Sequence, residues 1–440
     1  MIEYLPIILF GAIFLLILLG YPVAFTLGGL SVVVGILVFD IDFFYLLSLR
    51  LYGTMQNFVL LAVPLFVFMG IMLEKSGIAE RLLETMALLF GRFRGGLAIS
   101  VVIVGAMLAA STGIVGATVV TMGLISLPTM LKRGYGPRLS TGTIASSGTL
   151  GQIIPPSVVL VLLGSVLQVS VGDLFLAAII PGLGLVICYL LYIIIYSMVF
   201  PDKAPSMPEE EIKAFKKEGL SLQVVKSFLF PFLLILAVLG SIFAGIASPT
   251  EAAGVGAFGA LLLTILHRKL TFKILKEVMR ETTFLTSMVF MILIGATAFS
   301  LVFRGLEGDR LFLRVIESSQ LGPYGFLALV MIMVFIAGFF IDFIEIVFII
   351  VPVVAPIFVA MGIDLIWIGI LLAINLQTSF LTPPFGFALF FLKGVAPPEV
   401  KTIHLYQGVI PFVIIQIIFL ILLILFPEIV SFLPNLAAAG

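Results

Sequence analysis

The 440-residue sequence has little charge. Asp, Glu, Lys and Arg make up 10% of it, against about 25% of a typical soluble domain, and 62% of its residues are hydrophobic. The composition therefore excludes an ordinary soluble globular protein and predicts an integral membrane protein, because about 20 apolar residues span a bilayer as a helix. Basic and acidic residues are equal in number, at 23 each, so no excess of positive charge points to a nucleic-acid partner.

Cysteine and histidine are almost absent. Cys188 is the single cysteine, which excludes an intrachain disulfide, and its apolar surroundings predict an inert core position. The two histidines, His267 and His404, lie far apart near segment ends, which argues against a metal site. The N-terminus lacks the basic region and small-residue cleavage site of a secretory signal, so we expect residues 5–20 to form the first span.

Two adjacent prolines interrupt the apolar stretch "TLGQIIPPSVV" and predict a break in a membrane helix. Displacing the sequence by 228 residues places Pro155–Pro156 on Pro383–Pro384, and the same displacement places Pro128 on Pro356. Further glycine and alanine pairs share this offset without a gap. The recurrence indicates an internal duplication, with one broken helix in each half.

We therefore predict an all-α integral membrane protein with two inverted-topology repeats. Each repeat would hold about five transmembrane helices and one re-entrant helical hairpin, because its fourth apolar run, of about 36 residues, has a polar or glycine-containing centre. The predicted divisions are a first repeat, 1–200, with hairpin 96–131 and broken helix 139–168; a cytoplasmic linker, 201–228; a second repeat, 229–428, with hairpin 324–361 and broken helix 364–393; and a C-terminal tail, 429–440.

The distribution of basic residues predicts the orientation. With the N-terminus outside, 19 of the 23 Lys and Arg residues fall in cytoplasmic segments, and only Arg50, Arg304, Arg310 and Arg314 do not. We therefore expect both termini on the periplasmic side, and the two hairpins to enter from opposite sides. The stretch 267–284 is predicted to lie along the cytoplasmic interface as an amphipathic helix.

Paired hairpins and paired broken helices are typical of secondary transporters, in which unwound backbone near the bilayer midplane binds substrate and coupling ion. Carbonyl and hydroxyl oxygens suit a small cation, and helix N-termini favour an anion. Polar residues recur beside both proline pairs, although close helix packing also selects small polar side chains. Asp342 and Glu345 share one helical face, and three roles stay open for them: holding a cation, carrying a proton, or capping a helix end.

Other classes of membrane protein fit the residues less well. A membrane aspartyl protease needs two facing carboxylates from separate helices, whereas Asp342 and Glu345 lie on one hairpin, so we do not expect an enzyme. A channel needs no inverted hairpins. A stand-alone sodium- or proton-coupled carboxylate carrier remains the alternative within the transporter class.

Four motifs, "STGIVGAT", "GTLGQIIPPS", "GFFIDFIEI" and "NLQTSFLTPPFGFAL", resemble the hairpins and broken helices of the large membrane subunit (M component) of tripartite ATP-independent periplasmic (TRAP) transporters, within the ion transporter superfamily. "KRGY" and "SPTEAAGVGA" fit the same family. The resemblance implies sodium-driven import of an organic acid anion by an elevator mechanism, with scaffold and transport domains, in the cytoplasmic (inner) membrane. It also implies a separate small four-helix membrane subunit (Q component) and a periplasmic substrate-binding protein (P component).

The resemblance further implies two or more sodium ions, between each hairpin and the adjacent broken helix. The first site would use Ser111, Gly113, Gly116, Gly148, Gly151 and Pro155, and the second Gly338, Asn375, Thr378, Thr382 and Pro383. Polar residues in the same segments are then expected to bind the substrate: Thr112, Thr149, Gln152, Asp342, Glu345, Gln377 and Ser379. "STGIVGAT" has fewer hydroxyls than many family members, and Glu345 stands where many have a neutral residue.

Overall fold

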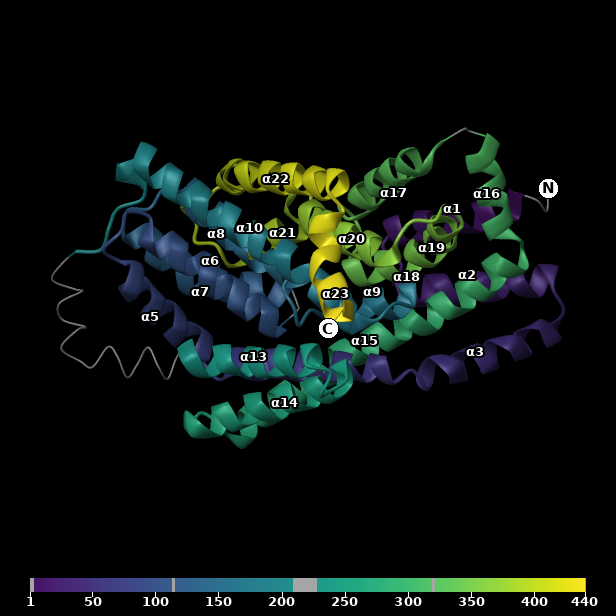
Figure 1. The fold of residues 1–440 in the computed structure, drawn as a ribbon, viewed down its shortest axis with the longest axis horizontal. Helices are drawn as coiled ribbons and strands as arrows, with labels where there is room; N and C mark the ends of the chain where they lie inside the picture. Colours follow the sequence, from purple (N-terminus) through teal and green to yellow (C-terminus); the bar gives the residue numbers. More distant parts are fainter. Residues whose placement is uncertain (1–3, 113–114, 209–227, 319–320, 440) are drawn as a thin grey trace.

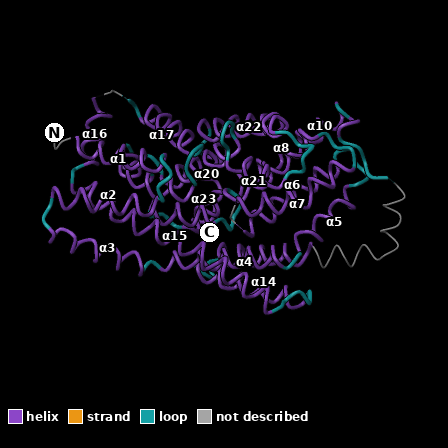
Figure 2. Tube along the Cα trace, turned by 180° about the vertical axis from the view of Figure 1, so that it is seen from behind, coloured by secondary structure: helices purple, strands orange, loops and turns teal. Residues whose placement is uncertain are grey.

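The computed structural model describes residues 4–112, 115–208, 228–318 and 321–439 as a bundle of helices, with no strand in these ranges (Figures 1 and 2). The first half comprises α1 (Leu5–Leu18), α2 (Val23–Val38), η2 (Ile41–Phe44), α3 (Tyr45–Met55), η3 (Phe58–Leu61), α4 (Ala62–Lys75), α5 (Ile78–Phe90), α6 (Gly96–Thr112), α7 (Val115–Lys132), α8 (Pro137–Thr149), η4 (Leu150–Gln152), α9 (Val158–Leu167), α10 (Val171–Val199) and η5 (Pro201–Lys203). The second comprises α13 (Phe230–Phe243), α14 (Pro249–Leu266), α15 (Phe272–Gly305), α16 (Gly308–Ser318), α17 (Pro323–Ala337), α18 (Phe343–Ile349), α19 (Val351–Ala360), α20 (Leu365–Leu381), α21 (Phe387–Val395), α22 (Thr402–Leu425) and α23 (Glu428–Ala439).

The order of elements repeats at the offset found in the sequence. Adding 228 to the first and last residue numbers of α6 to α10 gives the first and last residue numbers of α17 to α22, to within a few residues. In this correspondence α18 and α19 together match α7. Each predicted broken helix is interrupted at its proline pair, and Pro155–Pro156 and Pro383–Pro384 are both cis. In the second hairpin segment, α18 and α19 meet at a 50° bend.

Two segments differ from their predicted form. Residues 272–284 are not a separate interfacial helix but the start of the 34-residue α15. No proline lies within α15, and its first internal glycine is Gly295, so nothing ends the helix where the first half has the break between α3 and α4. The C-terminal segment, predicted as a tail, forms the helix α23.

The bundle has a layer of long helices along one side. Helices α2, α4, α13, α14 and α15, here called the long-helix layer, pack on one another, and Figure 1 shows α13 and α14 at the lower edge. The central helices α8 and α20 lie deeper in the molecule. Every residue of α8 from Leu139 to Thr149 is buried, as is every residue of α20 from Trp367 to Leu381.

The lengths and surfaces of the helices suit a bilayer. Six of the helices that the structure describes are long and apolar enough to cross a membrane, or seven if the bent pair α18–α19 counts as one span. On α10, the side chains of Leu183, Ile187, Leu191 and Ile195 are all more than half exposed. Their spacing of four residues gives one apolar stripe, as expected of a helix facing lipid.

Glycine allows α8 and α22 to meet at backbone distance. A Cβ atom on Gly142 would collide with the carbonyl oxygen of Gly408, and one on Gly408 with that of Arg138. At the same crossing the Thr141 hydroxyl donates a hydrogen bond to the His404 carbonyl, 3.1 Å away. Small residues permit this close approach, which stabilises helix pairs in membranes.

The Gly142→Ala substitution is therefore expected to destabilise the protein by about 1–3 kcal/mol, because the added methyl group separates α8 from α22. The measurement is thermal unfolding of the purified chain in detergent. Gly29→Ala is the control, since a Cβ atom there has no neighbour within 4 Å. Equal unfolding midpoints for the two variants would contradict the packing argument.

Candidate ion and substrate site

The first hairpin segment packs on the first broken helix. Helices α6 and α7 contact one another, and both contact α8. A Cβ atom on Gly105 of α6 would lie 2.5 Å from Cβ of Ser147, and one on Gly151 only 2.7 Å from the carbonyl oxygen of Ala109. On Gly148 it would collide with Val119 of α7. The structure thus brings Gly148 and Gly151 against the hairpin.

The other predicted residues of the first site are placed differently. Gly116 faces the ring of Phe391 on α21, where a Cβ atom would come within 2.9 Å, so its neighbour belongs to the second half. Pro155 is buried within the break. Ser111 and Thr112 form the end of α6, and Gly113 lies outside the described residues.

The second hairpin segment packs on the second broken helix in a similar way. The Asn375 amide of α20 donates a hydrogen bond to the Met331 carbonyl of α17, 2.7 Å away. Ser379, one turn further along, occupies the space that a Cβ atom on Gly338 would need. The structure therefore places Gly338, predicted for the second sodium site, against Ser379, predicted for the substrate, and Asn375 against α17.

Backbone oxygens gather where α20 ends. The Thr378 hydroxyl donates to the Ile374 carbonyl (2.7 Å) and the Thr382 hydroxyl to the Thr378 carbonyl (2.8 Å), which leaves the lone pairs of both hydroxyls available. The carbonyl oxygens of Phe380 and Thr382 each lie 3.1 Å from the Cβ position of Gly386. With φ at +36°, Gly386 has a conformation that side chains disfavour. Phe380 and Gly386 were not among the residues predicted for the site, although "TPPFG" indicates a turn there.

Asp342 and Glu345 form a capping box at the start of α18. Asp342 Oδ1 accepts a hydrogen bond from the Phe343 backbone N–H at 2.7 Å, and Glu345 Oε2 accepts one from the Asp342 N–H at 3.2 Å. Of the three roles left open by the sequence, the structure shows the helix cap. Both carboxylates stabilise the helix N-terminus that follows the hairpin turn.

Several buried polar side chains in the broken helices make no hydrogen bond to the protein. Neither the nitrogen nor the oxygen of the Gln152 amide has a partner among the described residues, and the same holds for the hydroxyls of Thr143 and Ser146. The Gln377 amide lies beside the Tyr189 hydroxyl. Both glutamines are fully buried, and η4, which carries Gln152, packs against α20, which carries Gln377. Because buried polar groups in native proteins are nearly always paired, these side chains indicate a bound ligand or water. Thr149, by contrast, donates its hydroxyl hydrogen to the Ser146 carbonyl.

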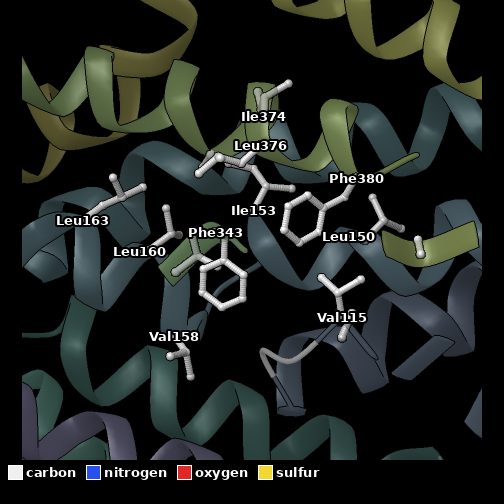
Figure 3. Packing of buried hydrophobic residues seen from close by; sticks show 14 of the residues in the cluster. Val115, Leu150, Ile153, Val158, Leu160, Leu163, Phe343, Ile374, Leu376 and Phe380 are labelled. Carbon is white, nitrogen blue, oxygen red and sulfur yellow. The ribbon is translucent and has the colours of Figure 1, made fainter. Parts of the chain in front are cut away.

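A single apolar cluster joins the two breaks. Figure 3 shows Leu150 and Ile153 of the first break close to Ile374 and Phe380 of α20. The rings of Phe380 and Phe343, the first residue of α18, lie 6.3 Å apart. Apolar side chains therefore hold the two interrupted helices together and keep lipid and bulk water from the polar groups beside them.

The fold and the site define a multi-pass membrane protein whose two most deeply buried helices are interrupted and lined by unpaired polar groups. Residues 10–429 match the family described as "Tripartite ATP-independent periplasmic transporter, DctM component". The chain belongs to this family, the large permease component of TRAP transporters, and is a multi-pass protein of the inner membrane.

Permeases named for different substrates are similar to this chain over most of their length. The C4-dicarboxylate TRAP transporter large permease protein DctM of Pseudomonas aeruginosa is 33% identical over 409 residues, which cover 92% of this chain and 93% of that protein. The ectoine permease TeaC of Halomonas elongata is 30% identical (96% and 97% covered), and the sialic acid permease SiaM of Vibrio cholerae 31% (88% of each). The crystal structure of the Alcanivorax borkumensis YdaH transporter shares the fold, with a TM-score of 0.64 at 15% identity, covering 92% of this chain and 98% of that one.

Two substitutions at Asp342 distinguish the contribution of its helix cap to stability from the contribution of its negative charge. Asp342→Ala is expected to lower the free energy of unfolding by about 0.5–2 kcal/mol through loss of the cap. Asp342→Asn should stay close to the wild type, because an asparagine oxygen also caps a helix N-terminus. Thermal unfolding in detergent measures both variants, and a loss in Asp342→Asn as large as that in Asp342→Ala would show that the cap requires a carboxylate.

Proposed function

We propose that this chain imports a small organic acid anion by sodium-coupled secondary transport, with substrate delivered by a periplasmic binding protein. The observation that carries the proposal is the fully buried amide of Gln152 at the first break, which has no partner among the described residues, together with the fully buried amide of Gln377 on the second interrupted helix. An amide offers N–H donors to a carboxylate and an oxygen to a hydroxyl or cation. Membership of the TRAP family supports transport with a binding protein.

Two sodium ions would bind where each hairpin meets its broken helix. In the second half, the Thr378 and Thr382 hydroxyls and the carbonyl oxygens at the end of α20 supply hard oxygen ligands of the kind that replace water around Na⁺. In the first half, the Ala109 carbonyl beside Gly151 and the backbone around Pro155 supply the equivalent set. Asp342 would contribute its charge from the capping position.

The relatives support an organic acid as the substrate class. Their names specify C4-dicarboxylates, sialic acid, ectoine and isethionate, which all carry a carboxylate or a sulfonate. The polar residues nearest the two breaks, Thr149, Gln152, Gln377 and Ser379, would hold this group together with bound sodium. No Lys or Arg occurs within α8, η4 or α20 after Arg138, so the positive charge facing the anion would come from sodium.

The arrangement of layers supports an elevator mechanism, in which the hairpins and broken helices slide against the long-helix layer. Two side-chain hydrogen bonds link the moving part to the layer and its connecting helix η3. The Thr121 hydroxyl of α7 donates to Glu74 Oε1 of α4 at 2.5 Å, and the Asn57 amide donates to Ser165 Oγ of α9 at 3.1 Å. Apolar contacts make up much of the remaining boundary, and they are non-directional, so they permit sliding.

The proposed partners are the periplasmic binding protein and a separate small four-helix membrane subunit. The isethionate permease DctMQ of Oleidesulfovibrio alaskensis extends beyond this chain, which covers 66% of it. A stand-alone sodium- or proton-coupled carboxylate carrier is the second candidate. Reconstitution into proteoliposomes with and without a binding protein distinguishes the two, since only the stand-alone carrier transports without one.

Asp342→Asn and Thr378→Ala are expected to abolish sodium-driven uptake in proteoliposomes while both variants still insert and fold. The first removes a charge and the second a cation ligand. Thr283→Ala is the matched control, because the exposed Thr283 hydroxyl makes the same hydrogen bond four residues back (2.8 Å to the Met279 carbonyl) far from the breaks. Full uptake by either test variant would count against its place in the second sodium site.

Cross-linking residues 74 and 121 is expected to block uptake, because the two positions belong to parts that must slide past one another. Cysteines at both positions, in a background with Cys188 replaced, would be joined by a short bifunctional thiosulfonate reagent and released by reductant. Uptake should fall on cross-linking and return on reduction. The two single-cysteine variants treated with the same reagent are the controls, and full transport in the cross-linked protein would exclude the elevator proposal.

A further inference from the structure

A polar cavity lies where α3 and α15 meet α9 and α19, and none of its lining residues is among those assigned above to sodium or substrate. It encloses about 560 Å³, within the range of small-molecule sites in proteins. Its walls come from α3, α9, α15 and α19. Figure 1 shows α3 and α16, which follows α15, at the opposite end of the molecule from α5.

Among the residues that the structure describes, two arginines line this cavity and no Asp or Glu does. Arg50 comes from α3 and Arg304 from the last turn of α15. The pKa of the Arg50 guanidinium is lowered by partial burial and then by the positive charge of Arg304, so two like charges are close together. Arg50 has no ion pair or hydrogen bond in the part of the chain that the structure describes.

Arg304 is held in place by a neighbour outside the cavity. Its Nε atom lies 3.5 Å from Oδ2 of Asp309 on α16. This ion pair uses only Nε, so both terminal nitrogens of the guanidinium can donate hydrogen bonds to another acceptor. A single carboxylate therefore faces two guanidinium groups, and the local charge is positive. Both guanidinium groups are exposed, so this positive charge is accessible to an anion from solution.

Neutral polar side chains complete the lining. Ser165 and Gln168 come from the end of α9, and Thr297 and Ser300 from the face of α15 that carries Arg304. Asn57 joins the two sides, since its Nδ2 donates to Ser165 Oγ. Apolar walls from α19, including Pro352 and Val359, suit the carbon skeleton of a small organic molecule.

We propose that this cavity is a binding site for a small organic anion bearing at least one carboxylate, with Arg50 and Arg304 as its cationic ligands. Guanidinium groups bind carboxylates in paired, charge-assisted hydrogen bonds, and the hydroxyl and amide groups around them can satisfy the remaining lone pairs. The site is distinct from the residues assigned above to sodium and substrate.

The position of the cavity suggests at which step of transport the anion would occupy it, and this assignment rests on the proposed function. Arg50 and Arg304 are among the four basic residues predicted to lie on the periplasmic side. An anion released by a binding protein would thus be held at the boundary along which the hairpins slide, before it reaches Gln152 and Gln377. Anion binding itself requires neither the sodium sites nor the elevator.

The test measures binding of succinate to the purified chain by isothermal titration calorimetry in sodium-free choline buffer, so that sodium-dependent binding at the breaks does not contribute. Arg50→Gln and Arg304→Gln are each expected to weaken succinate binding about 10- to 100-fold, the effect of losing charge-assisted hydrogen bonds. Arg50→Lys should lose less, because it keeps the charge. Wild-type affinity should fall as choline chloride is raised.

Arg310→Gln is the matched control, since Arg310 lies near Arg304 but outside the cavity, paired with Glu307 at 2.8 Å. Its affinity for succinate should equal that of the wild type, and unfolding midpoints should be alike in all variants. The proposal is overturned if the wild type binds no succinate, if both glutamine variants bind as the wild type does, or if Arg310→Gln loses as much. Loss of sodium-driven uptake with intact sodium-free binding would instead refute the proposed function alone.

Discussion

The structure depends on one constraint: inside a bilayer, every backbone N–H and C=O group needs a partner within the protein. Breaking a helix at Pro155–Pro156 or Pro383–Pro384 releases several such groups at once. The broken helices therefore occupy the most deeply buried positions, with α6, α7, α17 and α22 around them. Glycines at the contacts let the covering helices approach closely enough to exclude lipid, as at Gly105, Gly148 and Gly151.

The same constraint explains why the polar groups at the breaks are suited to binding. Hydroxyls such as Thr378 and Thr382 satisfy their hydrogens on the carbonyls of their own helix and present lone pairs outward. The Gln152 amide cannot be satisfied in this way, and in the part of the chain that the structure describes it has no hydrogen-bond partner. Ligand binding at such a site is favourable, because a buried amide without a hydrogen-bond partner raises the free energy of the empty protein.

Much of this organisation was predictable from the sequence, because proline and glycine act through local backbone geometry. The 228-residue offset located both breaks and the order of elements around them, and "GFFIDFIEI" located the interruption of the second hairpin segment between α17 and α18. The capping role of Asp342 and Glu345 was not decided, since residues three apart on a helix are neighbours whether they bind an ion or cap an end. The continuous α15 was missed because basic residues in 267–284 indicate an interface and say nothing about where a helix stops. The cavity of Arg50 and Arg304 depends on long-range packing between helices about 250 residues apart, which no local pattern reports.

The close crossing of α8 and α22 has a consequence for biosynthesis. Helix α8 carries six hydroxyl side chains, and its partner at the Thr141–His404 hydrogen bond follows 263 residues later in the chain. At bacterial rates of translation, that distance takes roughly 15 to 50 seconds to synthesise. For this interval α6 and α7 can already pack on α8, but the face of α8 that meets α22 at Gly142 stays uncovered. Final packing of the centre is thus a late, post-insertional step, and a ribosome that stalls before α22 leaves this surface open to other membrane proteins.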